Sequence, residues 1–166
     1  MMRVLGVDTS LRSTGVAVIE VDGRRLTKTA YKLVKSSRNL PASQCLHHLY
    51  TAIVGIIARQ KPDAAAVEGI FYCRNIKTAV SLGEARGAVK AACAAGGVPV
   101  YEYTPRFVKQ AVTGRGAASK EQVGKMVMLI LNLDDMPQED VSDALAIAIC
   151  HIHRMQNLPL QTLKEM

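Results

Sequence analysis

Hydrophobic residues in the first part of the chain follow the two-residue period of β-strands. Apolar positions alternate with polar ones or run together over residues 3–8, 13–21 and 24–34. The Asp22-Gly23 pair between the second and third segments is a strong signal for a hairpin turn. The chain is therefore expected to open with three antiparallel strands, of which the first is buried and ends in an acid, Asp8.

The spacing of apolar residues changes to a helical period after Pro41. Leucine and isoleucine recur at steps of three and four residues, which predicts an amphipathic helix of about 18 residues that ends at Lys61-Pro62-Asp63. Ser119 and Gln122 resemble a capping box at the start of a later helix. Downstream of residue 63, strands are expected over 64–68 and 98–103, and helices over 76–95, 105–112, 119–132 and 137–156.

This order of elements predicts the fold class. Three meandering strands followed by alternating helices and strands are typical of an α/β sandwich, in which helices on both faces flank a mixed five-stranded sheet. With 166 residues and a mass of 18.0 kDa, the chain has the size of one ordinary domain. We expect a single domain over residues 1–156 and a loose tail over 157–166.

Four acidic residues stand at positions that such a fold would bring together. Asp8 and Glu68 end two predicted strands, and ligands gather beyond the carboxyl ends of parallel strands. Asp140 and Asp143 are three residues apart at the start of the last helix, so they share one face. Oxygen ligands are those that hard cations such as Mg²⁺ prefer, and two such ions together can catalyse phosphoryl transfer.

Each of these acids also has a purely structural explanation. Asp8 could form an Asx-turn, Glu68 could form a salt bridge at the strand end, and the Asp140–Asp143 pair could complement the helix dipole. The convergence of all three locations at one sheet edge favours the metal site over three separate structural roles.

The rest of the chain is basic, with 21 Lys+Arg against 14 Asp+Glu and a formal net charge of +7. Such an excess alone could be an ordinary solubilising surface. Its distribution is more informative, because basic residues that bracket an acidic site fit contacts to a phosphate backbone. Those between Glu68 and Asp140 include Arg74, Lys77, Arg86, Lys90, Arg106, Lys109, Arg115, Lys120 and Lys125.

Composition indicates a reducing compartment and no membrane span. The four cysteines are scattered without a CxxC pair, which favours reduced, buried thiols in a cytoplasmic protein. No apolar stretch reaches the roughly 18 uncharged residues of a membrane span. The first apolar run meets Asp8 at once, so we interpret it as a strand and not as a signal peptide.

Five segments between about residue 3 and about residue 155 carry a resemblance to a known family. They are Val7-Asp-Thr-Ser-Leu-Arg-Ser-Thr-Gly15, Val67-Glu-Gly-Ile-Phe71, Leu82-Gly-Glu-Ala-Arg-Gly87, Val108-Lys-Gln110 and Asp140-Val-Ser-Asp-Ala-Leu-Ala-Ile-Ala148. In this order and spacing they resemble RuvC, the bacterial Holliday-junction resolvase family. The resemblance covers nearly the whole chain.

The resemblance implies a ribonuclease H-like fold, a homodimer and hydrolysis of DNA phosphodiesters in four-way junctions by paired symmetric nicks. It implies two Mg²⁺ ions per active site, for which Mn²⁺ can substitute, and a branch-migration motor as a partner. The implied metal ligands are Asp8, Glu68, Asp140 and Asp143.

The resemblance also implies roles for residues beside the metals. Lys109 and Lys120 match basic residues that contact DNA and support cleavage, and Phe71 matches an aromatic residue that stacks on bases at the crossover. Arg74, Lys77 and Arg115 are further candidates for DNA contact. A structural alternative for Phe71 is a buried cap over the core.

The chain departs from the family's pattern directly after Asp8. Thr9-Ser10 stands where the family commonly has Pro-Gly, so the geometry of this turn is left open. The two hydroxyl groups could bond backbone or phosphate. The Gly83–Gly87 spacing in the 76–95 helix permits close helix approach, for which core packing and a dimer interface are the two alternatives.

Histidines are weaker candidates for metal binding. His151 and His153 are two residues apart and would face different sides of a helix, which disfavours joint ligation. His47 and His48 are expected on the exposed face of the first helix.

Three other functions are alternatives to junction cleavage. A junction-binding module that does not cut would gain nothing from four carboxylates. A ribonuclease H-like nuclease with another nucleic-acid substrate stays open. An actin- or Hsp70-like ATPase, whose first phosphate loop the segment from Asp8 to Gly15 loosely resembles, needs two duplicated lobes, and 166 residues without repeats are too few.

Overall fold

The structure, a computed structural model, describes residues 1–69 and 75–157 of the chain. In these ranges, five strands form one sheet in the order β3-β2-β1-β4-β5. The strands are β1 Met2–Asp8, β2 Ser13–Asp22, β3 Arg25–Lys35, β4 Ala64–Glu68 and β5 Val100–Tyr103. The helices are α1 Ala42–Gln60, α2 Ile76–Ala95, α3 Pro105–Thr113, α4 Lys120–Leu131 and α5 Glu139–Asn157.

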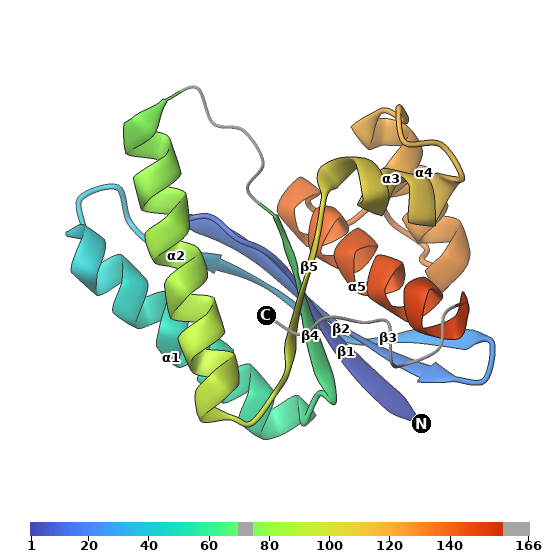
Figure 1. Ribbon diagram of the computed structural model, residues 1–166, viewed down its shortest axis with the longest axis horizontal. Helices are drawn as coiled ribbons and strands as arrows, with labels where there is room; N and C mark the ends of the chain where they lie inside the picture. The colour runs from blue at the N-terminus through green and yellow to red at the C-terminus, as the bar shows by residue number, and fades with distance from the viewer. Residues whose placement is uncertain (70–74, 158–166) are drawn as a thin grey trace.

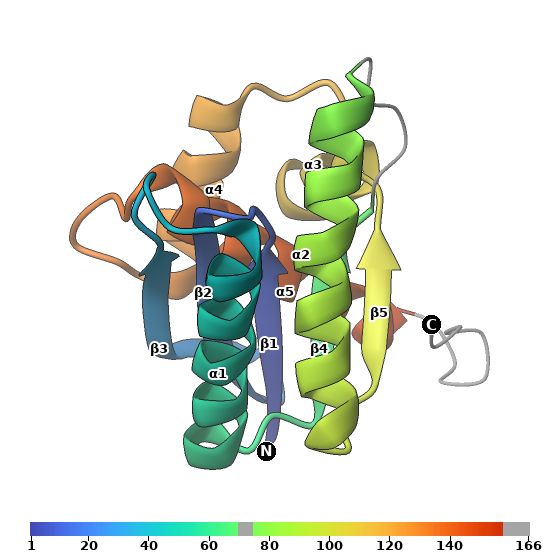
Figure 2. The ribbon, with the colours of Figure 1, turned by 90° about the vertical axis from the view of Figure 1, so that its left-hand side faces the viewer.

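The helices form a layer on each face of the sheet (Figure 1). Helices α1 and α2 cover one face, which is the face nearest the viewer in Figure 2. Helices α3, α4 and α5 cover the other, with α5 in direct contact with β1 and β2. The predicted α/β sandwich with a mixed five-stranded sheet and helices on both faces is confirmed.

The pairing of the strands brings two of the predicted site positions to one edge. Strands β1, β2 and β3 are antiparallel neighbours, whereas β4 pairs parallel with both β1 and β5. Val7 of β1 lies opposite Val67 of β4 in this parallel register. Asp8 and Glu68 therefore follow side by side at the carboxyl ends of neighbouring strands, as the sequence predicts.

Several helix ends follow from local chemistry. Lys61 ends α1 in a left-handed conformation and donates its N–H to the Ile57 carbonyl, and Pro62 follows. The capping box of Ser119 and Gln122 is present at the start of α4. Two predicted boundaries are wrong by two residues: β5 begins at Val100 rather than 98, and α5 begins at Glu139 rather than 137. Pro99 has no N–H for the ladder, which explains the later start of β5.

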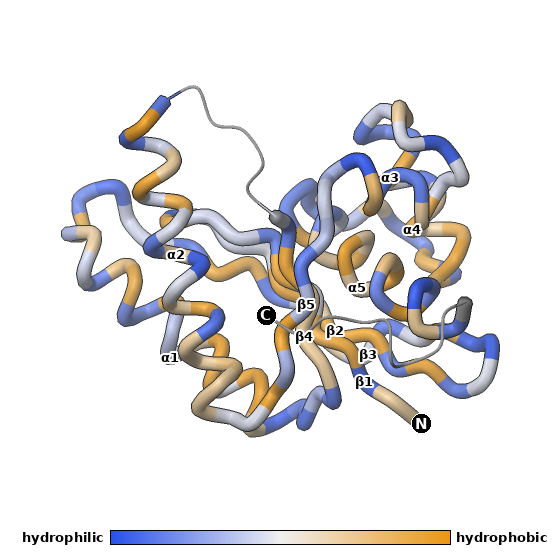
Figure 3. The backbone as a smooth tube through the Cα atoms, in the orientation of Figure 1, coloured by the Kyte–Doolittle hydropathy of each residue, from blue (hydrophilic) through white to orange (hydrophobic). Residues whose placement is uncertain are grey.

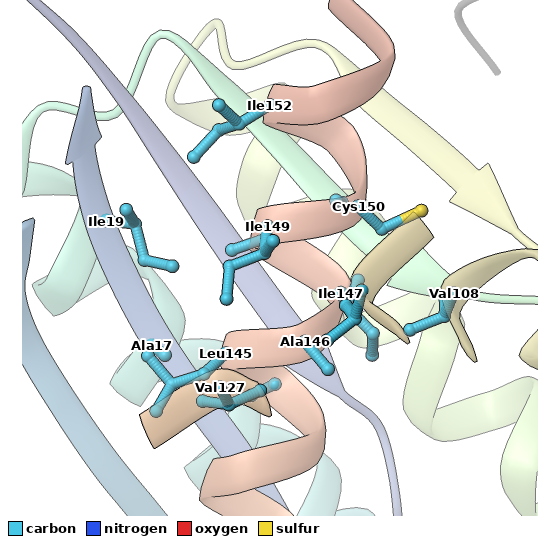
Figure 4. Close-up of a cluster of buried hydrophobic side chains, with 14 of the residues drawn as sticks. Ala17, Ile19, Val108, Val127, Leu145, Ala146, Ile147, Ile149, Cys150 and Ile152 are labelled. Carbon is cyan, nitrogen blue, oxygen red and sulfur yellow. The ribbon is translucent and has the colours of Figure 1, made fainter. Parts of the chain in front are cut away.

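Two hydrophobic cores lie on the two faces of the sheet. Figure 3 shows the hydrophobic segments in orange in the central strands and along α5. In the core shown in Figure 4, Leu145 and Ile149 of α5 lie over Ala17 and Ile19 of β2, and Val108 of α3 lies on the other side of the helix. The middle of α5 is buried on all sides because it lies between the sheet and the α3–α4 layer.

Two glycines allow α5 to lie directly on the sheet. A Cβ atom at Gly6 would lie 2.0 Å from the carbonyl oxygen of Ala144, and one at Gly15 would lie 1.8 Å from that of Asp140. Any larger residue would push the helix away. The start of α5, with Asp140 in its first turn and Asp143 in its second, is thus held against β1 and β2 at the edge where Asp8 lies.

The described residues also bear on two predictions about compartment. Cys45, Cys93 and Cys150 are buried free thiols, as expected, and Cys73 lies outside the described ranges. None of the helices within residues 1–69 and 75–157 is long and apolar enough to cross a membrane.

Candidate active site

Three of the four predicted metal ligands line one cavity at the carboxyl edge of the sheet. Asp8 and Glu68 project on the α5 face of their strands, and Asp143 reaches the same space from the first turns of α5. The cavity measures about 270 Å³, several times the roughly 30 Å³ that one water occupies. Its lining is Asp8, Glu68, Pro105, Val108, Lys109, Lys120, Val123, Asp143, Ala146 and Ile147.

Asp8 lies close to the other three acidic residues of the site. Its pKa is raised from 3.8 to about 7, first by burial and then by the charges of Asp143, Glu68 and Asp140. The positive charge of Lys120 acts in the opposite direction and lowers this pKa. The three other predicted ligands therefore all lie close enough to Asp8 to disfavour its charged form.

As at Asp8, burial and neighbouring charges affect the pKa of Glu68, but more of these charges are positive. Its pKa is raised by burial and by Asp143, while Lys120, Lys109 and Arg86 lower it. The two lysines that the sequence predicts beside the site therefore both act on a predicted metal ligand.

Lys120 forms the ion pairs that close one side of the cavity. Its Nζ lies 2.5 Å from Glu139 Oε1 and 3.1 Å from Asp143 Oδ2. The hydrogen bond to Glu139 is the largest cause that raises the pKa of Lys120, and the bond to Asp143 adds to it. Glu139 was not among the predicted site residues. Its only signal in the sequence is its place directly before Asp140.

Asp140 is held by a residue from the other end of the chain. Ser13, the first residue of β2, donates its hydroxyl to Asp140 Oδ2. Ser13 was not predicted as a site residue either. The contact follows from packing: Ser13 and Gly15 lie on the same side of the strand, and Gly15 allows the close approach of the Asp140 backbone.

The cluster fits a divalent metal by the chemistry of its donors, since four carboxylates supply only hard oxygen ligands. In this conformation, no three carboxylate, imidazole or thiol groups within residues 1–69 and 75–157 lie close enough to share one ion. Metal binding would therefore have to draw the carboxylates closer together. Repulsion at Asp8 provides a physical reason for them to accept a cation.

The turn after Asp8 closes without the glycine that the family commonly has there. Thr14 Oγ1 donates to the Ser10 carbonyl at 2.5 Å and accepts from the Ser10 N–H at 3.1 Å. Thr9 is buried, and neither Thr9 nor Ser10 has a positive φ. This turn geometry therefore suits Thr9-Ser10, and the Ser10 backbone bonds a neighbouring hydroxyl.

The predicted DNA-binding residues have different positions. Lys109 lines the cavity from α3. Lys77 is exposed in the first turn of α2, and Arg115 is exposed in the loop after α3. Phe71 and Arg74 lie outside the described residues.

The histidines engage other parts of the molecule. His151 is buried and its Nδ1 lies 2.6 Å from the Tyr103 hydroxyl, while His153 Nδ1 lies 2.9 Å from the Ala111 carbonyl. His47 and His48 are exposed on α1, as predicted.

The match to a family model agrees with this site. The model described as "Crossover junction endodeoxyribonuclease RuvC" matches residues 4–151, a range that includes all four carboxylates. The RuvC protein of Caldicellulosiruptor saccharolyticus is 44% identical over 153 residues, which are 91% of this chain and 92% of that protein. The RuvC of Alkalilimnicola ehrlichii is 45% identical over 154 residues, covering 93% of each chain.

Solved structures with the same fold include nucleases of this kind. T. thermophilus RuvC in complex with Holliday junction substrate superposes with a TM-score of 0.93 at 35% identity and covers 100% of both chains. The yeast mitochondrial Holliday junction resolvase Ydc2 matches with a TM-score of 0.67 at 12% identity, covering 92% of this chain and 79% of its own. The second likeness shows the fold alone.

Proposed function

Because this chain belongs to the RuvC family of crossover junction endodeoxyribonucleases, we propose that its four clustered carboxylates are the centre at which it cuts junction DNA. The protein is a Holliday junction resolvase with a ribonuclease H-like fold, and nucleases of this family need a divalent metal. The observation that carries the proposed centre is the convergence of Asp8, Glu68 and Asp143 on one cavity beside two lysines.

The proposed ligands are Asp8, Glu68, Asp140 and Asp143, and the proposed metals are two Mg²⁺ ions, for which Mn²⁺ can substitute. When bound, such a pair supplies an activated water for in-line attack and stabilises the leaving oxygen. The ligands themselves contribute negative charge. The charges of the three other carboxylates act on Asp8, so its affinity for cations is coupled to all of them.

Lys120 and Lys109 are proposed to hold the phosphodiester over the carboxylates. Lys109 lines the cavity, and Lys120 forms ion pairs with Asp143 and Glu139. If the Asp143 carboxylate binds a metal ion, Lys120 loses one of its two ion-pair partners. Its ammonium group can then bind a phosphate oxygen. Charge-assisted contacts of this kind supply most of the sequence-independent affinity for DNA.

The paired symmetric nicks are proposed to come from a homodimer that forms through α2. The inner side of α2 is anchored by Arg86, whose guanidinium lies 2.6 Å from the carboxylate of Glu102 near the end of β5. Its outer side carries Gly83 and Gly87, at which an added Cβ atom would meet nothing within 4 Å. Packing inside the monomer therefore does not require these glycines, which favours the dimer over core packing.

Exposed apolar residues extend this face of α2. Ile76 and Val80 are 81% and 56% exposed. Their spacing of four residues places them on one stripe, which continues toward Gly83 and Gly87. An apolar stripe beside small residues suits close packing against a second copy of the helix. Two active sites related by a twofold axis could then act on two symmetric strands.

The substrate of the T. thermophilus protein supports a four-way junction as the substrate here, given the 35% identity over the whole chain. A branch-migration motor as partner is proposed from the family alone. A cytoplasmic location is proposed from the buried, unpaired thiols Cys45, Cys93 and Cys150.

A three-substrate assay tests the proposed function. The protein is incubated with a mobile four-way junction, a linear duplex of the same sequence and a flap, each with Mg²⁺ or with EDTA. We expect paired, symmetric nicks in the junction alone and only with Mg²⁺. Equal cutting of the flap would instead favour a ribonuclease H-like nuclease with a broader substrate range. An Asp8→Asn control shows whether any nicks come from a contaminating nuclease.

A further inference from the structure

Ser13 and Asp140 are joined by a side-chain hydrogen bond although 127 residues separate them in the sequence. The Ser13 hydroxyl donates to Oδ2 of Asp140, and the contact is partly buried. Only one of the two carboxylate oxygens is used by this bond. The other, Oδ1, has no hydrogen-bond partner among the described residues.

The fold directs this contact in two ways. Ser13 and Gly15 lie two residues apart on β2, so both lie on the α5 side of the sheet. Gly15 allows the Asp140 backbone to approach until a Cβ atom would be 1.8 Å from its carbonyl oxygen. The same approach that needs Gly15 brings the Asp140 side chain within reach of the hydroxyl at position 13.

We propose that Ser13 is a positioning residue, which fixes the orientation of the Asp140 carboxylate so that Oδ1 faces a divalent cation. This inference rests on the proposed function, in which Asp140 is a metal ligand. Ser13 itself is not proposed to touch the metal or the DNA. It acts only through Asp140.

The expected size of the effect follows from other metal sites. A ligating carboxylate is usually oriented by a hydrogen-bond donor behind it, and loss of that donor costs 10–100-fold in metal affinity or activity as a rule of thumb. A merely structural hydrogen bond at the start of β2 would change stability and leave the affinity for metal as it was.

Threonine and valine at position 13 provide a matched pair. Both are β-branched and suit the first residue of a strand, and they differ only in a hydroxyl against a methyl group. Ser13→Thr keeps the donor and Ser13→Val removes it. Ser13→Ala serves as a second, smaller variant without the donor, in case a β-branched residue does not fit.

The experiment measures Mn²⁺ binding directly by electron paramagnetic resonance or calorimetry, without DNA, together with thermal melts in EDTA. We expect Ser13→Val and Ser13→Ala to bind Mn²⁺ about 10–100-fold more weakly than wild type, and Ser13→Thr to bind within about threefold. All three should melt close to wild type in EDTA. Junction cleavage by the first two should recover as the metal concentration is raised, with an unchanged KM for the junction.

A double-variant comparison with Asp140→Asn separates the inference from the proposed function. If Asp140 is a ligand, Asp140→Asn binds Mn²⁺ weakly, and adding Ser13→Val weakens binding no further. If Asp140→Asn binds Mn²⁺ weakly but Ser13→Val and Ser13→Ala bind it as tightly as wild type, the positioning role is wrong and the ligand assignment stands. If Asp140→Asn itself binds as wild type, the ligand assignment fails and the inference fails with it. An additive loss in the double variant would overturn the route through Asp140.

Discussion

Gly15 of β2 lies directly beneath Asp140 of α5, so close that a Cβ atom at position 15 would be 1.8 Å from the Asp140 carbonyl oxygen. The first two turns of α5 carry two of the four proposed metal ligands, Asp140 and Asp143. The position of these carboxylates relative to Asp8 therefore depends on an absent side chain in a neighbouring strand. This relationship leads to the first prediction.

Gly15→Ala should displace the start of α5 and separate the carboxylates. Overpacking of this kind typically costs about 1–3 kcal/mol of unfolding free energy. We expect a lower melting temperature and a larger loss of junction cleavage than the stability change explains, measured well below the melting temperature. Gly55→Ala is the control, because a Cβ atom there meets only the flexible end of Arg59, at 3.4 Å, and alanine favours the helix. Normal cleavage by Gly15→Ala would show that the close contact does not position the site.

Asp8→Asn should stabilise the metal-free protein at alkaline pH. The pKa of Asp8 is about 7 in the folded state and 3.8 as the ordinary value, so the unfolded state ionises first as the pH rises. Stability is lost through the window from about pH 4 to about pH 7, and the loss is complete above it. At about 1.4 kcal/mol per pKa unit, removal of the charge is worth at most about 4 kcal/mol.

Denaturant unfolding of both proteins in EDTA, at pH 4.5 and at pH 8, checks this prediction. The variant should be more stable at pH 8 and similar to wild type near the lower pH. It should also lose stabilisation by Mg²⁺ and lose cleavage, while it keeps junction binding. If wild type and variant have the same pH dependence in EDTA, Asp8 does not carry the electrostatic cost of the cluster.

Lys109→Ala and Lys120→Ala should weaken contacts to phosphate. Each should slow cleavage and reduce the slope of log affinity against log salt by about one. Lys125→Ala is a control on α4, because Lys125 is exposed and pairs with Glu121 four residues away at 2.6 Å. Cleavage is measured at saturating Mg²⁺, since loss of Lys120 also frees Asp143. If all three variants have the same salt slope, the two lysines are ordinary solvated surface.

The features that sequence reasoning predicted are those set by local pattern. The strand ends at Asp8 and Glu68 follow from apolar runs, and the shared face of Asp140 and Asp143 follows from helical spacing. Convergence of the two sets follows from the parallel pairing of β1 with β4, which the order of elements implies.

The contacts that were missed depend on how α5 lies on the sheet. Ser13 reaches Asp140 across 127 residues, and Glu139 reaches Lys120 across 19. Neither contact has a periodicity or a motif, because each is produced by packing: the first by the approach of α5 to β2 that Gly15 permits, and the second by the contact of α4 with α5. Gly15 of β2 shows that a small residue facing a helix can indicate where polar side chains of the strand and the helix meet.

His151 should make the stability of the fold depend on pH in mildly acidic solution. It is fully buried against Tyr103, and burial lowers its pKa from 6.5 to about 4. The unfolded chain therefore takes up a proton first as the pH falls, so stability is lost between about pH 6.5 and pH 4 and is fully present above this window. The slope approaches about 1.4 kcal/mol per pH unit within it.

Unfolding free energies of His151→Gln, measured from pH 4 to pH 7, check this contribution. The variant should be less stable near neutral pH, since the bond to Tyr103 is disturbed, and its stability should fall less steeply as the pH is lowered. His48→Gln changes an exposed histidine and should keep the wild-type slope. An unchanged slope in His151→Gln would mean that His151 titrates alike in both states.

Gly87→Arg should separate the proposed dimer without damaging the monomer. A Cβ atom added at position 87 meets nothing within 4 Å in the monomer, but an arginine there would add a charge to the α2 stripe of Ile76, Val80, Gly83 and Gly87. Sedimentation of wild type is expected to give twice the 18.0 kDa mass of one chain, and the variant is expected to give the monomer mass with a cooperative melt that no longer depends on protein concentration. Its nicks on a junction should become single and uncoupled.

Ala58→Arg, which places the same charge on the exposed side of neighbouring α1, should remain dimeric and cut in pairs. If Gly87→Arg sediments as wild type does, the dimer forms through another surface.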